Sequence, residues 1–381
     1  MLPIPIQKIH IPHGTRVLVR TSLNVPIQDG EVLSMFRLHS ALETIRFLRS
    51  IKARITLISH LSDSRGSLAP VHQILNRFIP VSFIPQITGE APYAARKNLQ
   101  PGEIVLLENV RSDHREQESD DLFAEEIAAN ADMFVFDDFT AAHRSHASTV
   151  NLIRYLPSYA GIQFYKEVTA AMRITERLRK PAVAVLGGAK CSTKLPLIAK
   201  LSETYDALCV GGVLANTLLK HRGYEVGLSK VEEVEIPEVL AKKTNVLLPQ
   251  DVIVTKDFLN IRTVPIDSIG KDETIVDIGD QTLKIIQHHL NNAKTVFMNG
   301  PTGWYEKGFT HQTATLANMV VNTNAYTLAG GGDIVALLEK VDMIKKLHFV
   351  STGGGALLQY LAEGTLPVLQ VFEEKAKEKT Q

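Results

Sequence analysis

Residues 37–59 read RLHSALETIRFLRSIKARITLIS, a helical pattern that leads at once into a strand pattern. ARITLIS is a nearly continuous apolar run, which is typical of a strand buried on both faces. A helix followed directly by such a strand predicts α/β architecture, with a parallel sheet covered by helices. Apolar side chains recur at the spacing of one helix face at Leu38, Leu42, Ile45, Leu48 and Ile51.

The same alternation runs through the whole chain. About eleven strands would make an unusually wide single sheet, so we expect two Rossmann-like, doubly wound parallel sheets. The first half offers RVLVR (16–20), ARITLIS (53–59), VSFIP (81–85), EIVLLE (103–108) and MFVF (133–136). The second half offers AVAVL (182–186), ALCV (207–210), VLLP (246–249), TVFM (295–298), YTLA (326–329) and HFVS (348–351).

A helical segment separates the two halves. YKEVTAAMRITERLRK (165–180) has a helical pattern and stops at Pro181, because proline cannot continue a helix. We therefore expect an N-terminal domain over 1–163, a helical hinge over 164–180 and a C-terminal domain over 181–367. The tail over 368–381 predicts a short amphipathic helix.

Composition excludes several classes of protein. Lys+Arg and Asp+Glu number 41 each, without the basic excess of a nucleic-acid binder. No apolar stretch reaches the length of a membrane span, and the N-terminus lacks the apolar region of a signal peptide. Two cysteines, Cys191 and Cys209, are too few for a disulfide framework and lack metal-site spacing. We expect a cytoplasmic protein without nucleic-acid or membrane partners.

Basic and polar side chains follow the expected strands of the first half. Ligands of α/β sheets bind beyond the carboxyl ends of the strands, so these scattered positions should meet at one edge. Arginine forks match carboxylate and phosphate oxygens, which predicts a pocket for a small, multiply charged anion. Any one of these residues alone is more often a surface charge or a core histidine. The set is Ser22, Asn24, Arg37, His60, Arg111, His143 and Arg144.

Glycine-rich turns follow the expected strands of the second half. Glycine lets backbone N–H groups approach an oxyanion, and the N-terminus of the next helix adds its positive end. Several such turns at one edge predict a polyphosphate site, although neither a Walker A spacing nor a clean G-x-G-x-x-G occurs. The turns are LGGAKCSTK (186–194), VGGVLANT (210–217), MNGPTGWYE (298–306), AGGGDI (329–334) and STGGGA (351–356).

Several side chains beside these turns extend the predicted site. Lys190 and Lys194, four residues apart, should share one helix face. Asp333 follows a glycine triplet and is placed for a phosphate-bound Mg²⁺. Glu306 could hold a ribose hydroxyl or cap a helix. Trp304 and Tyr305 could face a base or pack in the core, and the core is the favoured prediction. An anion pocket in one half and a nucleotide site in the other predict phosphoryl transfer.

Eight motifs resemble, in order and nearly end to end, those of the phosphoglycerate kinase family, and of its bacterial members in particular. They are LNVP (23–26), SHL (59–61), LLENVR (106–111), AHRSHAST (142–149), LGGAK (186–190), NGPTGWYE (299–306), GGGD (330–333) and STGGGA (351–356). The resemblance implies reversible phosphoryl transfer between 1,3-bisphosphoglycerate and ADP, giving 3-phosphoglycerate and ATP. It also implies Mg²⁺ as cofactor, closure about the hinge, and a tail that packs on the N-terminal domain. We expect a monomer.

The resemblance assigns roles by position. It gives phosphoglycerate binding to Ser22, Leu23, Asn24, Arg37, His60, Asp63, Arg65, Arg111, His143 and Arg144. It gives nucleotide binding to Gly188, Ala189, Lys190, Lys194, Gly212, Asn299, Gly300, Glu306, Gly331, Gly332, Asp333 and Ile334, with Asp333 at the metal. It gives stabilisation of the transferring phosphoryl group to Arg37, Lys190 and the amides of Gly354 and Gly355.

The chain departs from the family pattern mainly in the anion pocket. Ser22 replaces the aspartate of R-x-D-x-N-V-P, and Asp63 replaces the arginine of S-H-L-G-R-P. A carboxylate at 63 that points inward would repel a phosphate, and Arg65 is a candidate replacement. The family's D-A-F-G-T-A-H-R has become DDFTAAHR (137–144), whose two acids are expected to cap or brace the loop. Ile334 replaces a threonine of the nucleotide site.

These departures leave three hypotheses open. The first is an active, divergent phosphoglycerate kinase. The second is a catalytically weak or inactive nucleotide-binding homologue with a regulatory role. The third is a kinase of a related carboxylate or phosphate acceptor.

Overall fold

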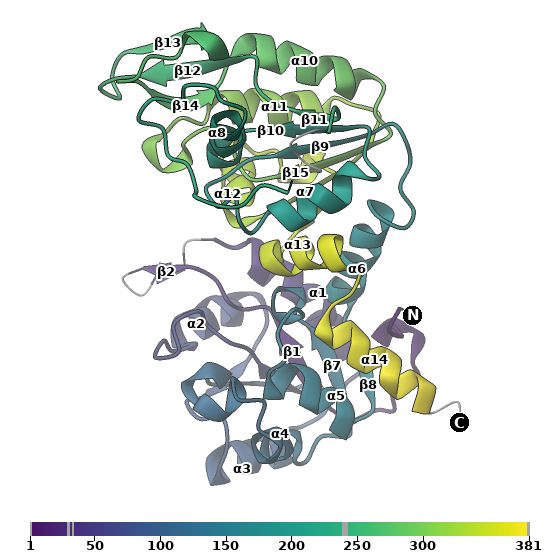
Figure 1. Cartoon of the computed structure of the whole chain (residues 1–381). Helices are drawn as coiled ribbons and strands as arrows, with labels where there is room; N and C mark the ends of the chain where they lie inside the picture. The colour runs from purple at the N-terminus through teal and green to yellow at the C-terminus, as the bar shows by residue number, and fades with distance from the viewer. Residues whose placement is uncertain (1, 29–30, 33, 238–242, 379–381) are drawn as a thin grey trace. The chain divides into compact units, whose positions relative to one another are not determined.

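A computed structural model describes residues 2–28, 31–32, 34–237 and 243–378 of the 381-residue chain (Figure 1). The last residues of the predicted tail, 379–381, lie outside this description. Contacts divide the chain into two compact units. The N-terminal unit comprises Met1–Thr169 and Thr365–Gln381, and the C-terminal unit comprises Ala170–Gly364.

The N-terminal unit is built on a six-stranded parallel sheet with the order β5-β6-β4-β1-β7-β8. The strand order changes direction between β1 and β7, and such a switch point is where open α/β sheets bind ligands. All the expected strands of this half are confirmed, and the short β8 is additional. The strands are β1 (Arg16–Thr21), β4 (Arg54–Ile58), β5 (Ser82–Ile84), β6 (Ile104–Leu107), β7 (Met133–Asp137) and β8 (Ser158–Ala160), with a hairpin of β2 (Ile27–Gln28) and β3 (Glu31–Val32).

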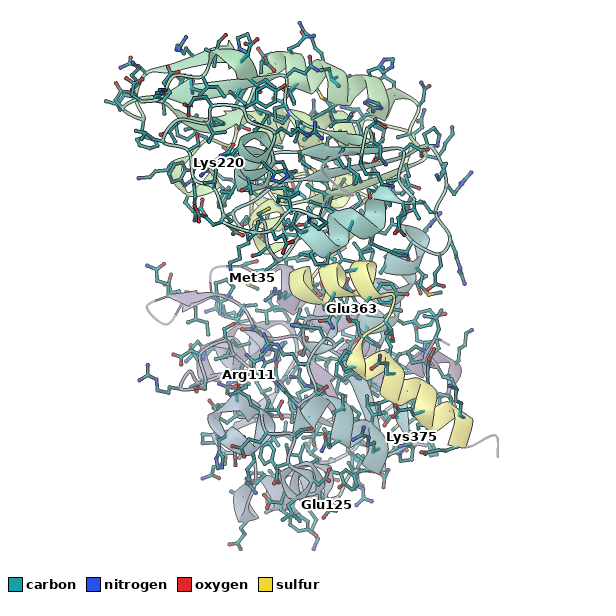
Figure 2. The ribbon with its side chains drawn as sticks, viewed as in Figure 1. Met35, Arg111, Glu125, Lys220, Glu363 and Lys375 are labelled. Carbon is teal, nitrogen blue, oxygen red and sulfur yellow. The ribbon has the colours of Figure 1, made fainter. Side chains whose placement is uncertain are left out.

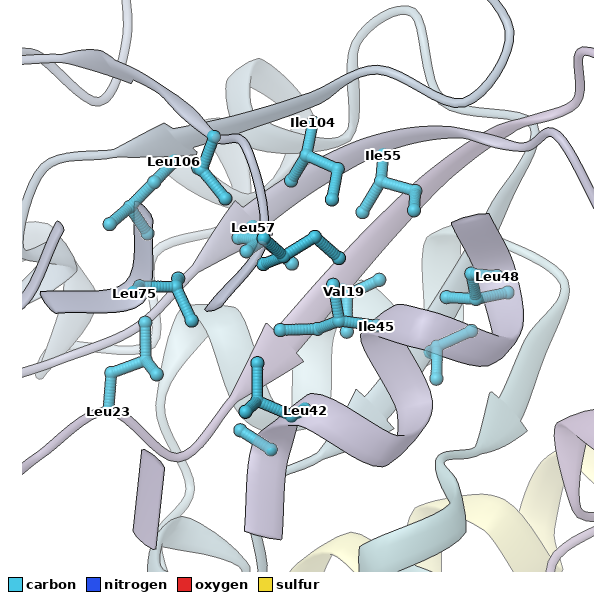
Figure 3. Packing of buried hydrophobic residues seen from close by; sticks show 14 of the residues in the cluster. Val19, Leu23, Leu42, Ile45, Leu48, Ile55, Leu57, Leu75, Ile104 and Leu106 are labelled. Atoms are coloured by element: carbon cyan, nitrogen blue, oxygen red, sulfur yellow. The ribbon is translucent and has the colours of Figure 1, made fainter. Parts of the chain in front are cut away.

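Helices cover both faces of this sheet. On one face, Val19 packs with Ile45 and Leu48 of the first helix in a fully buried cluster (Figure 3). On the other, Phe136 meets Phe164, which in turn stacks with Phe372 of the C-terminal helix. The helices are α1 (Phe36–Ser50), α2 (Ala69–Phe78), α3 (Glu90–Asn98), α4 (Asp121–Ala128), α5 (Leu152–Tyr155), α6 (Ile162–Arg173) and α14 (Pro367–Glu378).

Helix α14 is fixed to α5 by a cation at the end of that helix. The Nζ atom of Lys375 donates to the carbonyl oxygens of Ile153 and, at 2.5 Å, of Leu156 (Figure 2). The last carbonyls of a helix lack intrahelical partners and carry the negative end of its dipole, so an ammonium group is favourable there. The described part of the tail is therefore part of the N-terminal unit.

The C-terminal unit contains a second six-stranded parallel sheet, in the order β11-β10-β9-β15-β16-β17. Its switch point lies between β9 and β15. The strands are β9 (Ala182–Leu186), β10 (Ala207–Val210), β11 (Val246–Leu247), β15 (Thr295–Asn299), β16 (Tyr326–Gly330) and β17 (Phe349–Ser351). The helices are α7 (Leu195–Ser202), α8 (Gly212–His221), α10 (Asp280–Asn291), α11 (His311–Val321), α12 (Gly332–Lys340) and α13 (Gly354–Glu363).

A small antiparallel sheet in this unit was not predicted. It has the order β13-β12-β14, from β12 (Asp251–Thr255), β13 (Ile261–Pro265) and β14 (Thr274–Ile278). Its apolar side chains form a cluster of their own with Leu219 and Val226. The expectation of two doubly wound parallel sheets is confirmed, and this sheet adds to the second of them.

The predicted helix over 165–180 is shorter in the structure. Helix α6 ends at Arg173, and turns follow it. Ile174 and Thr175 are β-branched, and the Thr175 hydroxyl donates to the carbonyl of Ala171, which favours leaving the helix. The predicted domain boundaries and hinge stay predictions. Among the described residues, no helix is long and apolar enough to cross a membrane.

Candidate functional site

The predicted anion-binding residues lie at the switch point of the first sheet. The register pairs Thr21 of β1 with Asp137 of β7, so the residues after these two strands emerge side by side. The Asn24 side chain reaches His60 after β4, with 3.5 Å between Nδ2 and Nε2. Arg37, in the first turn of α1, donates to the carbonyl of Asn24 at 2.5 Å. Burial lowers the pKa of Arg37, and the carboxylate of Asp138 opposes that shift.

Arg111 is a buried cation of this group with unpaired nitrogens. It follows β6 on the short helix η2 (Val110–Ser112), and its side chain is buried within the N-terminal unit (Figure 2). Its NH1 is 3.4 Å from the carbonyl of Leu61, while Nε and NH2 have no hydrogen-bond partner within the described chain. Burial, together with the like charges of Arg144 and Arg20, lowers the pKa of Arg111 to about 10. A bound anion would supply the missing acceptors and relieve this repulsion.

Two histidines beside Arg111 are held neutral. Burial lowers the pKa of His143, and the charge of Arg144 adds to that effect. Burial also lowers the pKa of His146 to about 4, although its Nδ1 lies 3.7 Å from Glu116. A neutral imidazole donates through only one nitrogen. Positive charge at this edge therefore comes from the arginines.

A buried ion network that the sequence did not predict supports the pocket. Arg20 is fully buried in β1, pairs with Asp138, and donates to Ser148 Oγ at 2.8 Å. Its NH2 is 3.2 Å from Nδ1 of His60. The same Nδ1 lies 3.5 Å from Oδ2 of Asp138, so the ring of His60 is held between a guanidinium and a carboxylate. Burial lowers the pKa of His60 to about 4 despite Asp138, so the ring stays neutral at physiological pH.

One signal for this network was present in the sequence. Arg20 ends the apolar run RVLVR, and a charge inside a buried strand needs a partner. The partner, Asp138, is one of the two acids that were expected to cap or brace the loop. Asp138 pairs with Arg20 and accepts from the Thr140 hydroxyl, so it braces the loop. Asp137 instead caps α6, where its Oδ1 accepts from the backbone N–H of Phe164 at 2.9 Å.

The glycine turns of the C-terminal unit meet at the second switch point. Gly188 donates through its N–H to the carbonyl of Pro301 at 2.7 Å, and Gly212 donates to that of Thr302 at 2.8 Å. A Cβ at Gly187 would lie 2.0 Å from the carbonyl oxygen of Pro301. Gly188 and Gly212 thus use their N–H groups in backbone hydrogen bonds, and their role in nucleotide binding stays a prediction. They let three adjacent turns pack backbone against backbone.

The two lysines of the first turn have different surroundings. Helix α7 begins at Leu195, so Lys190 and Lys194 lie in the preceding turn, and the predicted shared helix face is wrong. Lys190 is exposed. Lys194 is buried, and its Nζ donates to the carbonyl of Gly187. Burial lowers the pKa of Lys194 to about 8, against the opposing charge of Asp333.

A cavity of about 740 Å³, open to solvent, lies beside these turns. Gly188, Ala189 and Gly212 line one part, with Asp333 and Glu306. The other part has an apolar wall from the antiparallel sheet and the turn after β15. That wall includes Pro249, Val252, Ile275, Val276, Ile278, Pro301 and Trp304.

Most of this apolar wall was missed because its strands were not predicted. Trp304 and Tyr305 are half-buried and line the cavity, so their predicted core position is wrong. Trp304 packs edge-on against Phe258 at 5.5 Å between ring centroids. Asn216 and Lys230 also line the cavity. The lining of the cavity thus combines glycine-rich and polar residues with apolar and aromatic ones, a combination that suits a phosphate chain attached to a base.

The remaining predicted nucleotide residues surround the same turns. Asn299 is buried and donates from Nδ2 to the carbonyl of Gly330 at 2.5 Å. Gly300 has φ +81° and Gly331 has φ +118°, a region that favours glycine. Gly332 and Asp333 begin α12, while Gly354 and Gly355 begin α13.

A family model described as phosphoglycerate kinase matches residues 6–364. The chain belongs to the phosphoglycerate kinase family. It is 40% identical over 380 residues to a phosphoglycerate kinase of Thermomicrobium roseum, which covers 95% of this chain and 97% of that protein. A phosphoglycerate kinase of Streptomyces avermitilis is 38% identical over 390 residues. The match covers 95% of this chain and 97% of that protein.

Solved structures of phosphoglycerate kinases have the same fold. That of Coxiella burnetii is 34% identical, with a TM-score of 0.86, covering 99% of this chain and 100% of that one. That of Pyrococcus horikoshii OT3 is 25% identical, with a TM-score of 0.87. The match covers 98% of this chain and 99% of that one. The similarity therefore extends over both units.

Two residues that the phosphoglycerate kinase resemblance assigned to ligand binding have buried, apolar side chains that cannot contact a ligand. Leu23 is fully buried in the hydrophobic cluster beneath α1, and its N–H donates to Ser59 Oγ at 3.0 Å. Ile334 is fully buried in α12. An aliphatic side chain packed in a core offers neither charge nor hydrogen bonds, so a role in binding is limited to the backbone.

The loop after β4 places its two charged residues at the surface. The Asp63 side chain is 66% exposed and that of Arg65 is 94% exposed, with 3.9 Å between their charged groups. Asp63 also accepts the backbone N–H of Arg65 at 2.9 Å. Such exposed pairs contribute little to stability. Ser22, in contrast, is buried and lies 3.4 Å from Thr140, oxygen to oxygen.

Proposed function

We propose that this chain catalyses reversible phosphoryl transfer between 1,3-bisphosphoglycerate and ADP, giving 3-phosphoglycerate and ATP. The observation that carries this proposal is Arg111, a buried guanidinium with two unpaired nitrogens among like charges. Such a group is costly unless an anion pairs with it. The triose phosphate carries both a phosphate and a carboxyl group, which suits several convergent arginines.

The proposed acceptor site is formed by residues after four parallel strands. Arg111 and Arg144 pair with the anionic groups, and His60, positioned by Arg20, lies beside them. Arg37 lies next to these residues, because its guanidinium donates to the backbone carbonyl of Asn24. We propose that it contributes to the same pocket. Because the histidines stay neutral, binding depends on charges that do not titrate near neutral pH.

The proposed nucleotide site uses the cavity of the C-terminal unit. The apolar wall holds the base, the glycine turns lie along the phosphates, and Glu306 approaches the ribose. Asp333 is exposed at the start of α12 and lines the cavity, and one carboxylate with substrate phosphates is a usual Mg²⁺ environment. Bound there, Mg²⁺ would neutralise charge on the phosphate oxygens.

Lys190 and the amides that open α13 are proposed to stabilise the transferring phosphoryl group. The transition state spreads charge over three oxygens and needs cations and aligned donors rather than a nucleophilic side chain. Lys190 is exposed and therefore free of the carbonyl partners that hold Lys194. We also propose a cytoplasmic, monomeric enzyme.

Coupled turnover with 3-phosphoglycerate and Mg–ATP tests the function. We expect turnover by the intact chain, and a loss of at least about 100-fold in Lys190→Ala with only modest loss of nucleotide binding. Lys200→Ala, on the exposed side of α7, is the matched control and should leave turnover unchanged. Nucleotide binding without turnover at millimolar acceptor would favour the non-catalytic homologue. Turnover restricted to another carboxylate or phosphate acceptor would favour the third hypothesis.

A further inference from the structure

A carboxylate sits beside Ser22, on the neighbouring strand. Because Thr21 pairs with Asp137 in the sheet, Ser22 and Asp138 are neighbours one step beyond the strand ends. Asp138 is fully buried, so it cannot itself touch a ligand. Thr140 connects it to the pocket. Its hydroxyl donates to Asp138 Oδ1 at 2.5 Å, and its Oγ1 lies 3.4 Å from Ser22 Oγ.

This arrangement fixes the polarity of the Thr140 hydroxyl. A hydroxyl has one proton and two lone pairs, and here the proton is committed to a carboxylate. Asp138 stays ionised because Arg20 pairs with it in a fully buried contact. Thr140 Oγ1 is therefore an acceptor toward Ser22 and toward the partly exposed side of its own side chain. A hydroxyl polarised by a charge is a stronger acceptor than an isolated one.

The contact between the Ser22 and Thr140 hydroxyls is long, so a donor that comes closer to Thr140 Oγ1 could replace it. At 3.4 Å it is at the limit of hydrogen-bond length, and it is much longer than the contact of Thr140 with Asp138. A ligand hydroxyl that reached Thr140 Oγ1 could form a shorter bond there. The Ser22 hydroxyl, which can donate or accept, would adapt to it.

We propose that Thr140, polarised by Asp138, is the acceptor that recognises the hydroxyl group of the organic acid bound in this pocket. For the acceptor named under Proposed function, on which this inference rests, that group is the C2 hydroxyl of 3-phosphoglycerate. Thr140 is then a specificity-determining residue, and Asp138 is a positioning residue that acts through it. The changes at positions 22, 138 and 140 relative to the family pattern form one hydrogen-bonded unit in this chain.

The test compares 3-phosphoglycerate with 3-phosphonooxypropanoate, the same molecule without the hydroxyl. The intact chain should prefer the hydroxylated acid by about tenfold in kcat/KM, the value of one net hydrogen bond. Thr140→Val keeps the shape of the side chain but removes the acceptor. The kcat/KM for the hydroxylated acid should therefore fall, that for the other acid should stay the same, and the preference should approach unity. Thr140→Ser keeps the hydroxyl and should retain the preference. Equal losses for both acids in Thr140→Val, or an unchanged preference, would overturn the inference.

Calorimetric binding of the same two acids separates this inference from the proposed function. If the intact chain binds both acids without turning them over, the proposed kinase function fails. A hydroxyl preference in binding that disappears in Thr140→Val would then still support the recognition site. If turnover is normal but Thr140→Val leaves the preference intact, the function stands and the role of Thr140 is refuted.

Discussion

Charge at single positions decides how strongly the anion pocket attracts its ligand. Arg37, Arg111 and Arg144 bring positive charge to it, whereas Asp63 adds a negative charge on the neighbouring loop. That carboxylate is 66% exposed, so solvent and salt screen it. Its effect on an anion should therefore be moderate, and it should act mainly before closure of the bound complex.

Asp63→Arg should lower the Michaelis constant for 3-phosphoglycerate by roughly threefold to tenfold, because repulsion is replaced by attraction. Asp63→Asn is the matched control, since its amide oxygen can still accept the Arg65 N–H and only the charge is lost. It should show a smaller decrease. Steady-state kinetics at low and high salt measure both variants. Michaelis constants equal to that of the intact chain would show that Asp63 faces away from the ligand.

Asp277 is a buried carboxyl group whose charge opposes folding. Burial raises its pKa to about 7, although Oδ1 accepts from Ile278 N–H and Thr302 Oγ1, each at 2.9 Å. The folded state holds this proton up to about pH 7, while the unfolded chain releases it near pH 4. Stability from this group is therefore full below about pH 4 and is lost as pH rises to about 7.

Asp277→Asn keeps the Oδ1 acceptor and removes the charge. Its stability advantage over the intact chain should grow from about pH 4 to about pH 7 and reach on the order of 2–4 kcal/mol above that. Chemical denaturation across this range measures it. Asp267→Asn, at an exposed position, controls for the change in net charge. Denaturation midpoints that shift by the same amount at every pH would contradict the buried charge.

The single residues differ in how far the sequence predicts them. His60 and Arg111 were predictable because they follow strands, and topology alone brings strand ends together. The ion pair of Arg20 with Asp138 joins residues 118 positions apart, so only the fold reveals it. Lys194 is similar, because nothing in LGGAKCSTK shows that one lysine turns inward to backbone carbonyls while the other stays exposed.

At the scale of elements, the nucleotide site depends on how closely the turns after β9, β10 and β15 approach one another. Their backbones bond directly, for example Gly187 N–H to the carbonyl of Asn299 at 2.9 Å. This approach is possible only where no Cβ intervenes. The backbones of these three turns thus form one surface of the cavity, which we call the backbone floor, and their close packing determines the shape of the cavity there.

Gly187→Ala should disturb this floor, because its Cβ would lie 2.0 Å from a backbone oxygen. We expect a loss of about 1–3 kcal/mol in stability and a weaker affinity for ATP, since the neighbouring turn must move. Gly332→Ala, where an added Cβ meets nothing within 4 Å, is the stability control. Thermal unfolding and nucleotide titration measure both effects. An equal change in melting temperature for the two variants would show that the close approach is unimportant.

The elements themselves were predictable to different degrees. Long apolar runs such as AVAVL and MFVF have one compatible environment, a buried parallel strand, and every such prediction was correct. The antiparallel sheet was missed because polar residues interrupt the apolar pattern of its strands DVIVT, IRTVP and TIVDI; β13 has a burial pattern with a single buried residue. Without that sheet, the apolar wall of the cavity could not be inferred.

At the scale of the whole molecule, the two candidate sites belong to two units of the chain. In-line phosphoryl transfer requires the attacking and leaving oxygens on opposite sides of one phosphorus atom, with reacting atoms about 3–3.5 Å apart. Ligands bound by separate units meet this requirement only in an arrangement of the units that brings the two ligands together, and closure about the predicted hinge would supply it. Closure also excludes water, which would otherwise compete as the phosphoryl acceptor.

X-ray scattering should therefore show a smaller radius of gyration when 3-phosphoglycerate and an ATP analogue that cannot transfer its phosphoryl group are both present. Each ligand alone should give a smaller change, because each is expected to contact one unit. Only the two ligands together would stabilise the arrangement in which the two units are close. Lys190→Ala tests the reason, since loss of a cation between two anions should weaken closure without abolishing either binding event. A radius that is the same with both ligands as with none would mean that the two sites do not work on one reaction, and the proposed transfer would fail.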